Sequence, residues 1–111
     1  MKLKTFIKKI DFKVIHEGSC GDTELTKPFC CDLLSLAMGR GSKGCVWVTV
    51  MGNINTLAVA SLNETGCIIL AEGASLDEAA AARAVQEDIT VLSSGLPVFE
   101  TALDAYRILQ S

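Results

Sequence analysis

The sequence has 111 residues, half of them hydrophobic, with a mean hydropathy of +0.38, which predicts one domain over residues 1–111. Its net charge of −3 is unevenly spread, because the first 16 residues hold five lysines and one acidic residue, whereas the remaining 95 hold five basic and twelve acidic residues. The basic start has no aromatic residue except Phe6 and Phe12. A solvated lysine face is therefore favoured over a nucleic-acid interface, and the apolar excess predicts a covered surface between subunits.

The first half of the chain is predicted to be less regular than the second. The patterns indicate, in chain order, a helix at 2–9, a strand at 12–16, a polar loop at 17–27 and a short extended piece at 28–31. Asp32 is predicted to cap a helix over residues 33–38, since its carboxylate suits the free N–H groups of a first turn. A glycine-rich turn at 39–44 should end that helix.

The second half alternates strands and helices. Strands are predicted at 45–50, 67–70 and 89–92, and helices at 54–62, at 75–88 and from Pro97 to 109. The second of these helices should begin at the capping box Ser75-Leu76-Asp77-Glu78. Short strands that alternate with helices favour parallel strands joined by right-handed crossovers. We therefore predict the α/β class: a three-layer domain with a mostly parallel sheet flanked by helices.

A membrane protein is not predicted. Residues 44–63 form a run of 20 residues without a charge, the length of a membrane span, but the run includes polar side chains and a Gly52-Asn53 turn signal. A buried strand, a turn and a buried helix explain the run better. Lys and Asp residues also interrupt the N-terminal segment before any apolar signal region forms. A cytoplasmic location is expected.

No catalytic centre is predicted. The glycines Gly39, Gly41 and Gly44 match the dinucleotide pattern Gly-x-Gly-x-x-Gly, but that pattern requires a strand before it and a helix after it, and here the order is reversed. A P-loop and a nucleophile elbow are both absent, and His16 is the only histidine. We therefore expect no enzyme activity and no cofactor.

Cysteine chemistry provides an alternative function. The five cysteines are Cys20, Cys30, Cys31, Cys45 and Cys67. An odd number without an export signal predicts thiols rather than disulfides, and the absence of Cys-x-x-Cys spacing argues against a metal site. A predicted helix start beside Cys31 would activate its thiol, although the neighbouring Asp32 opposes this. A redox or metal-binding accessory protein that uses Cys20, Cys30 and Cys31 is the alternative hypothesis.

Loops after the three regular strands form the predicted ligand site, since ligands of parallel α/β sheets bind beyond the carboxyl ends of the strands. Small, hydrogen-bonding side chains in these loops suit a polar small molecule or a nucleotide. The predicted ligand-binding residues are Gly52, Asn53, Asn55, Glu72, Gly73, Ser75, Ser93 and Ser94. The acidic residues Glu72, Asp77 and Glu78 weaken a phosphate-binding interpretation, and ordinary turn residues would explain the same composition.

Four segments resemble the DRTGG domain family. They are residues 29–35 (FCCDLLS), 46–50 (VWVTV), 55–62 (NTLAVASL) and 67–73 (CIILAEG), and the likeness extends over residues 12–109. It is strongest to short stand-alone members encoded near iron-only hydrogenase subunits in anaerobic bacteria. The Gly-Asp-Arg of the family corresponds to Gly52-Asn53-Ile54 and its Thr-Gly-Gly to Ala71-Glu72-Gly73, so only Gly52 and Gly73 keep the motifs.

The resemblance implies an accessory role. In larger proteins the DRTGG domain accompanies CBS domains of regulated pyrophosphatases, or phosphate acetyltransferases, and contributes to dimerisation. Its fold is similar to that of the N-terminal domain of HPr kinase/phosphorylase. We therefore expect a non-catalytic regulatory or interaction module that forms a homodimer. Its expected partner is a small polar ligand, a nucleotide or a hydrogenase-related protein in redox metabolism.

Overall fold

Short runs of β-branched and apolar residues form the sheet at the centre of the molecule. The computed structural model describes residues 1–111, and its strands are β1 (Lys13–His16), β2 (Pro28–Cys30), β3 (Val46–Thr49), β4 (Cys67–Leu70) and β5 (Val91–Ser93). They lie in the order β1-β5-β4-β3-β2. Strands β2 to β5 are parallel, and β1 joins β5 in the antiparallel sense. The prediction of a mostly parallel sheet is confirmed.

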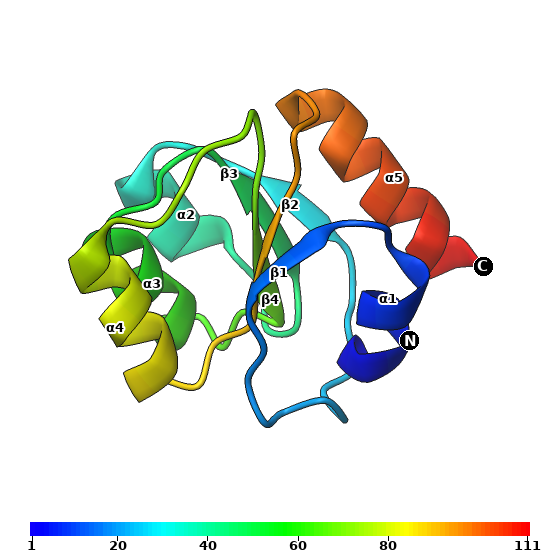
Figure 1. Ribbon diagram of the computed structural model, residues 1–111, viewed down its shortest axis with the longest axis horizontal. Coiled ribbons are helices and arrows are strands. Elements are labelled where there is room, and N and C mark those ends of the chain that lie inside the picture. Colours follow the sequence, from blue (N-terminus) through cyan, green and yellow to red (C-terminus); the bar gives the residue numbers. More distant parts are fainter.

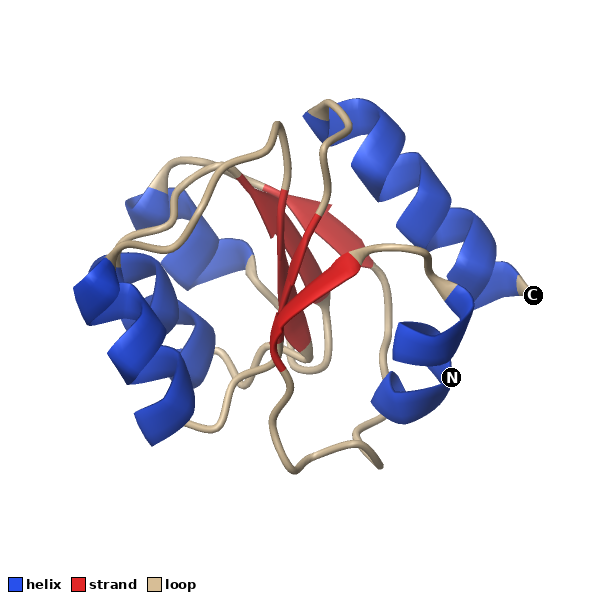
Figure 2. Ribbon diagram, in the orientation of Figure 1, coloured by secondary structure: helices blue, strands red, loops and turns tan.

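Helices cover both faces of this sheet. They are α1 (Leu3–Lys9), α2 (Leu34–Arg40), α3 (Ile54–Leu62), α4 (Glu78–Gln86) and α5 (Val98–Gln110). Figure 1 shows α2, α3 and α4 on one side of the sheet and α1 and α5 on the other, and Figure 2 shows the same three layers by secondary structure. The three-layer α/β prediction is confirmed. None of the five helices has both the length and the apolar character needed to span a membrane.

The central strands bury both of their faces, as expected for a parallel sheet between two helical layers. All four residues of β3 and all four of β4 are buried. Because side chains alternate along a strand, Trp47 packs into the core beneath α2, α3 and α4, while Val46 and Val48 pack into the core beneath α1 and α5. The uncharged run at 44–63 is therefore largely core strand and core-facing helix.

The predicted cap at Asp32 was wrong. Helix α2 begins at Leu34, one residue later than expected, and its N-cap is Leu33, without a side-chain hydrogen bond. The Asp32 Oδ1 atom instead accepts from the Thr49 hydroxyl at 2.7 Å and from the Val50 backbone N–H at 3.1 Å. The carboxylate therefore joins the start of α2 to the end of β3, where it satisfies a buried hydroxyl.

Other element boundaries also differ from the prediction. Asp77, not Ser75, is the N-cap of α4, and its Oδ1 accepts from the Ala80 N–H at 2.8 Å. Pro97 is the N-cap of α5 rather than a first-turn residue. The last strand covers 91–93 instead of 89–92. In contrast, α3 and β4 have the predicted bounds of 54–62 and 67–70.

The glycine motif begins at Gly39 in the last turn of α2, which extends to Arg40, and leads to β3. The turn is therefore shorter than the predicted 39–44, and the helix still precedes the strand. Gly41 donates its N–H to the Ala37 carbonyl at 2.8 Å and ends the helix. Gly44 has a φ of +77°, in the left-handed region that favours glycine. The order is the reverse of the one that a dinucleotide site requires.

Candidate ligand-binding site

The loops that follow β3, β4 and β5 meet at one edge of the sheet because these three strands are parallel neighbours. Gly52 lies at the closest approach of two of these loops. Its carbonyl accepts from the Asp77 N–H at 2.9 Å, and a Cβ atom at Gly52 would lie 2.0 Å from the Ser75 carbonyl oxygen. A side chain is therefore excluded here, which gives Gly52 a structural reason to be glycine.

Backbone hydrogen bonds join the second of these loops to the third. Glu72 donates its N–H to the Leu96 carbonyl at 2.8 Å, and Gly73 donates to the Ser94 carbonyl at 3.0 Å. Both Glu72 and Gly73 have left-handed backbones, with φ of 60° and 71°. The buried Ser94 hydroxyl lies 2.9 Å from the Thr101 hydroxyl on α5. The turn after β5 is thus fixed to both neighbouring elements.

The three helices that start at this edge are capped by oxygen atoms of the chain itself. Asn53 accepts from the Thr56 N–H at 3.1 Å at the start of α3, and Asp77 caps α4. The Glu72 carboxylate accepts from the Val98 N–H at 3.2 Å, at the start of α5. Since these oxygens already use the positive ends of the helix dipoles, a phosphate group would have to be held by other groups.

A groove of about 800 Å³ opens beside the start of β1 and the end of β5. Its lining comes from three parts of the chain: residues 9–13, from the end of α1 to the start of β1; Gly73 with residues 93–96; and Asp104, Arg107 and Ile108 of α5. Gly73, Ser93 and Ser94 of the predicted site line this groove. The other predicted residues, Gly52, Asn53, Asn55, Glu72 and Ser75, are not among its lining residues. Asn55 is exposed on the first turn of α3.

Five charged residues line the groove. Lys9, Lys13 and Arg107 are cationic, and Asp11 and Asp104 are acidic. None of the five takes part in an ion pair; the ion pairs of the chain all lie elsewhere. The Lys9 ammonium donates to the Ser111 hydroxyl at 3.2 Å. The groove therefore carries a small positive excess in a chain whose net charge is −3, with charges of both signs available to a ligand.

The sequence-based prediction missed the cations of this groove. Lys9 and Lys13 belong to the basic N-terminal segment, which was interpreted as a solvated lysine face. The structure places them at a ligand-sized groove because β1 pairs with β5, and Lys13 lies opposite Ser93 in that pairing. The lysine excess of residues 1–16 was the available signal, but the sequence does not show which strand end it lies beside.

The cysteines lie in different environments and are all free thiols. Cys30 is exposed on β2; partial burial, together with the Asp32 carboxylate and Cys31, raises the pKa of its thiol. Cys45 and Cys67 are buried, and burial raises the pKa of both. Cys20 is exposed, and its Sγ donates to Asp88 Oδ2 at 3.6 Å. The structure assembles no group of three or more His, Cys, Asp or Glu residues suited to a metal ion.

His16 has a structural partner. Its Nδ1 atom lies 2.9 Å from the Ile89 carbonyl oxygen, so Nδ1 carries a proton and donates. This hydrogen bond joins the end of β1 to the segment that leads into β5. The contact orients the ring, and it involves no serine or cysteine nucleophile.

Comparison with known proteins identifies a shared fold. No protein-family model matches the sequence, and no curated protein matches it either. Among solved structures, the chain is similar to the CBS and DRTGG domains of the regulatory region of Clostridium perfringens pyrophosphatase, crystallised with its activator diadenosine tetraphosphate. The TM-score is 0.72 at 13% sequence identity, and the match covers 97% of this chain and 45% of the pyrophosphatase region. The chain has a DRTGG-like α/β fold.

Proposed function

We propose that residues 1–111 form one DRTGG-like regulatory module that binds a small polar molecule in the groove between residues 9–13 and α5. The observation that carries the proposal is the groove itself, with three cations that form no ion pair within the chain. Its volume of about 800 Å³ lies within the ordinary range of small-molecule sites. The pyrophosphatase region of similar fold supports a regulatory role, since it was crystallised with an activator.

Binding without catalysis is favoured by the state of the candidate reactive groups. A histidine base acts on a nucleophile within hydrogen-bond reach, and the hydrogen-bond partner of the His16 ring is a backbone carbonyl rather than a serine or cysteine. A cysteine nucleophile needs a lowered pKa, whereas the pKa of Cys30 is raised. Both observations support a module that acts by binding a ligand rather than by catalysing a reaction.

Self-association belongs to the same proposal, with α5 as the contact surface. Phe99 and Tyr106 are seven residues apart, which places them on one face of α5, and 70% and 52% of their surfaces are exposed. Two exposed aromatic side chains on one helix face are typical of a protein contact. We propose that two copies pair through this face. The DRTGG resemblance adds a hydrogenase-related protein in redox metabolism as the regulated partner.

Ligand binding is tested by titrating the full chain with small anions and following its thermal unfolding. Inorganic phosphate, sugar phosphates and nucleotides form the panel. A ligand at about 100 times its Kd stabilises by about 2.7 kcal/mol, which corresponds to a rise in Tm on the order of 10 °C. The doubly substituted Lys13→Glu, Arg107→Glu chain should lose this rise, and the proposal fails if no member of the panel raises Tm.

A further inference from the structure

The lining of the groove narrows the class of its ligand. We propose that the groove binds a nucleoside phosphate, an inference that rests on the proposed function. Three features of the lining carry it: cations without an ion-pair partner, carboxylates in the same groove, and an apolar wall. Each feature matches a different part of such a molecule.

The cations provide the site for the phosphate. Lys9 ends α1, Lys13 begins β1, and Arg107 lies on α5, so the cations of the lining come from three different elements. A guanidinium binds two phosphate oxygens at once, and ammonium groups add point charges. Because the Glu72 carboxylate already accepts from the first N–H of α5, the cationic side chains rather than this helix terminus bind the anion. This arrangement differs from that of a glycine-rich phosphate loop.

The carboxylates oppose the binding of a bare anion. Asp11 and Asp104 line the same groove and form no ion pair with its cations. A carboxylate is a hydrogen-bond acceptor only, so these residues favour a ligand that brings donors beside its phosphate. The hydroxyl groups of a ribose and the exocyclic amine of a base are such donors.

The apolar wall suits a planar ring. Ile10, Phe12, Leu96 and Ile108 are the hydrophobic residues of the lining, and Phe12 and Leu96 are only partly covered by the rest of the protein. A base placed against them would bury apolar surface on both partners, and an aromatic ring at Phe12 allows stacking. A sugar phosphate offers no such ring, which is why the nucleoside phosphate fits the whole lining better.

Isothermal titration calorimetry of the full chain tests the inference with matched probes. Adenosine and guanosine 5′-monophosphates and 5′-triphosphates are compared with ribose 5-phosphate, with the free nucleosides and with inorganic phosphate. We expect at least one nucleotide to bind ten-fold or more tightly than ribose 5-phosphate and than its own nucleoside. Leu96→Ala and Phe12→Ala should weaken nucleotide binding several-fold and leave the affinity for ribose 5-phosphate unchanged. Leu96 is 39% exposed, so its truncation leaves a folded chain to measure.

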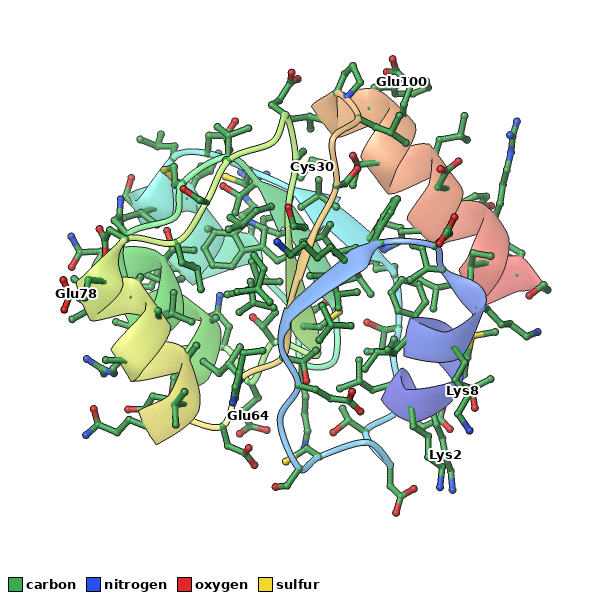
Figure 3. The ribbon with its side chains drawn as sticks, viewed as in Figure 1. Lys2, Lys8, Cys30, Glu64, Glu78 and Glu100 are labelled. Atoms are coloured by element: carbon green, nitrogen blue, oxygen red, sulfur yellow. The ribbon has the colours of Figure 1, made fainter.

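A charge-matched control separates the groove from the overall field of the protein. Lys13→Glu and Arg107→Glu should each weaken nucleotide binding ten-fold or more. Lys8→Glu makes the same charge change one residue from Lys9, but Lys8 projects from α1 away from the body of the molecule and is not part of the lining (Figure 3), so its effect should stay within two-fold.

The outcomes distinguish the two proposals. If ribose 5-phosphate or inorganic phosphate binds as tightly as every nucleotide, in a manner sensitive to Lys13, the groove is a small-anion site and the nucleoside inference is overturned while the proposed function stands. Equal losses in the Lys8 and Lys13 variants would also overturn it. If none of the probes binds, the proposed function fails together with the inference.

Discussion

The carboxylate of Glu72 accepts a hydrogen bond at 3.2 Å from the backbone N–H of Val98, the first residue of α5. It reaches this helix from the loop after β4, so one loop provides the cap for a helix that begins after the next strand. An anion at a helix N-terminus stabilises by about 0.3–1 kcal/mol. Glu72 therefore acts as an internal substitute for an external anion at α5.

Truncating this cap should destabilise the fold modestly. We expect Glu72→Ala to lower the free energy of unfolding by about 0.5–1 kcal/mol, because the first turn of α5 loses its acceptor. Urea denaturation followed by circular dichroism measures the change. Glu17→Ala, a change of the same charge on an exposed loop, should have an effect of about 0.3 kcal/mol or less; equal losses in the two variants would contradict the capping role.

Gly52→Ala should destabilise the protein much more strongly. The new Cβ atom would lie 2.0 Å from the Ser75 carbonyl oxygen, so the two loops would have to separate. We expect a loss of at least about 1–3 kcal/mol in urea denaturation. Gly39→Ala is the contrast, since its Cβ meets nothing within 4 Å on helix α2 and should stabilise by about 0.5–1 kcal/mol. If Gly52→Ala left the free energy of unfolding unchanged, the two loops would be able to separate without a loss of stability, which would contradict this prediction.

The Asp88 carboxylate should make stability depend on pH at the acid end. Hydrogen bonds from the hydroxyl and the backbone N–H of Ser19 hold the pKa of Asp88 below its ordinary value of 3.8. A pKa lowered in the folded state stabilises above the unfolded-state value, and this contribution is lost as the pH falls through the folded-state value. The stability difference between wild type and Asp88→Asn should therefore be largest near neutral pH and shrink below about pH 3.8.

Denaturation midpoints at pH 7, 4 and 3 measure this difference. A Ser19→Ala background removes the hydroxyl, the largest cause of the lowered pKa of Asp88, and keeps the backbone N–H. The change in the Asp88→Asn difference between pH 7 and pH 3 should therefore become smaller. A difference that stays constant from pH 7 to pH 3 in the wild-type background would rule out this linkage.

Thiol labelling should separate the five cysteines by burial. Exposed Cys20 and Cys30 are expected to react with a disulfide reagent in the folded protein, whereas buried Cys45 and Cys67 should react only after unfolding. Because the pKa of Cys30 is raised and the thiolate is the reactive form, its rate should still increase above pH 9. Cys30→Ser identifies that component. Rapid labelling of all five thiols in native buffer would contradict the packing of β3 and β4.

The oligomeric state should depend on the exposed face of α5. Light scattering of the wild type is expected to give twice the chain mass of 11.8 kDa, and Phe99→Ser with Tyr106→Ser should give the monomer. Leu62→Ser changes an apolar side chain that is 67% exposed on α3 instead and should leave the dimer intact. A wild-type monomer at high concentration would disprove the pairing.

Local patterns in the sequence were sufficient to predict the regular half of the fold. The run at 46–50 consists mainly of β-branched and apolar residues. It therefore predicted a strand buried on both faces without knowledge of the strands beside it. The bounds of α3 were also predicted, and its Asn53 cap is a local contact within one turn. Such features depend on residues that are close in sequence, which is why they can be inferred without the tertiary structure.

The parts that were missed depend on distant contacts. Asp32 looked like a helix cap because its partner, Thr49, lies 17 residues away. Ser75 looked like the start of α4. In the structure its carbonyl lies against Gly52, in the loop after β3, and the sequence around Ser75 does not indicate that contact. The groove needed the pairing of β1 with β5, so Lys9, Lys13 and Arg107 could not be grouped from their sequence positions.

The pairing of Lys13 with Ser93 also has a consequence for how the chain reaches its native state. Strand β1 precedes the other four strands along the chain, yet its only neighbour in the sheet is β5, which follows the other four. The pairing of β1 with β5 therefore closes a loop that contains the three other strands of the sheet. Closing so long a loop makes this docking the expected slow step of folding, and the walls of the groove come together only at that step.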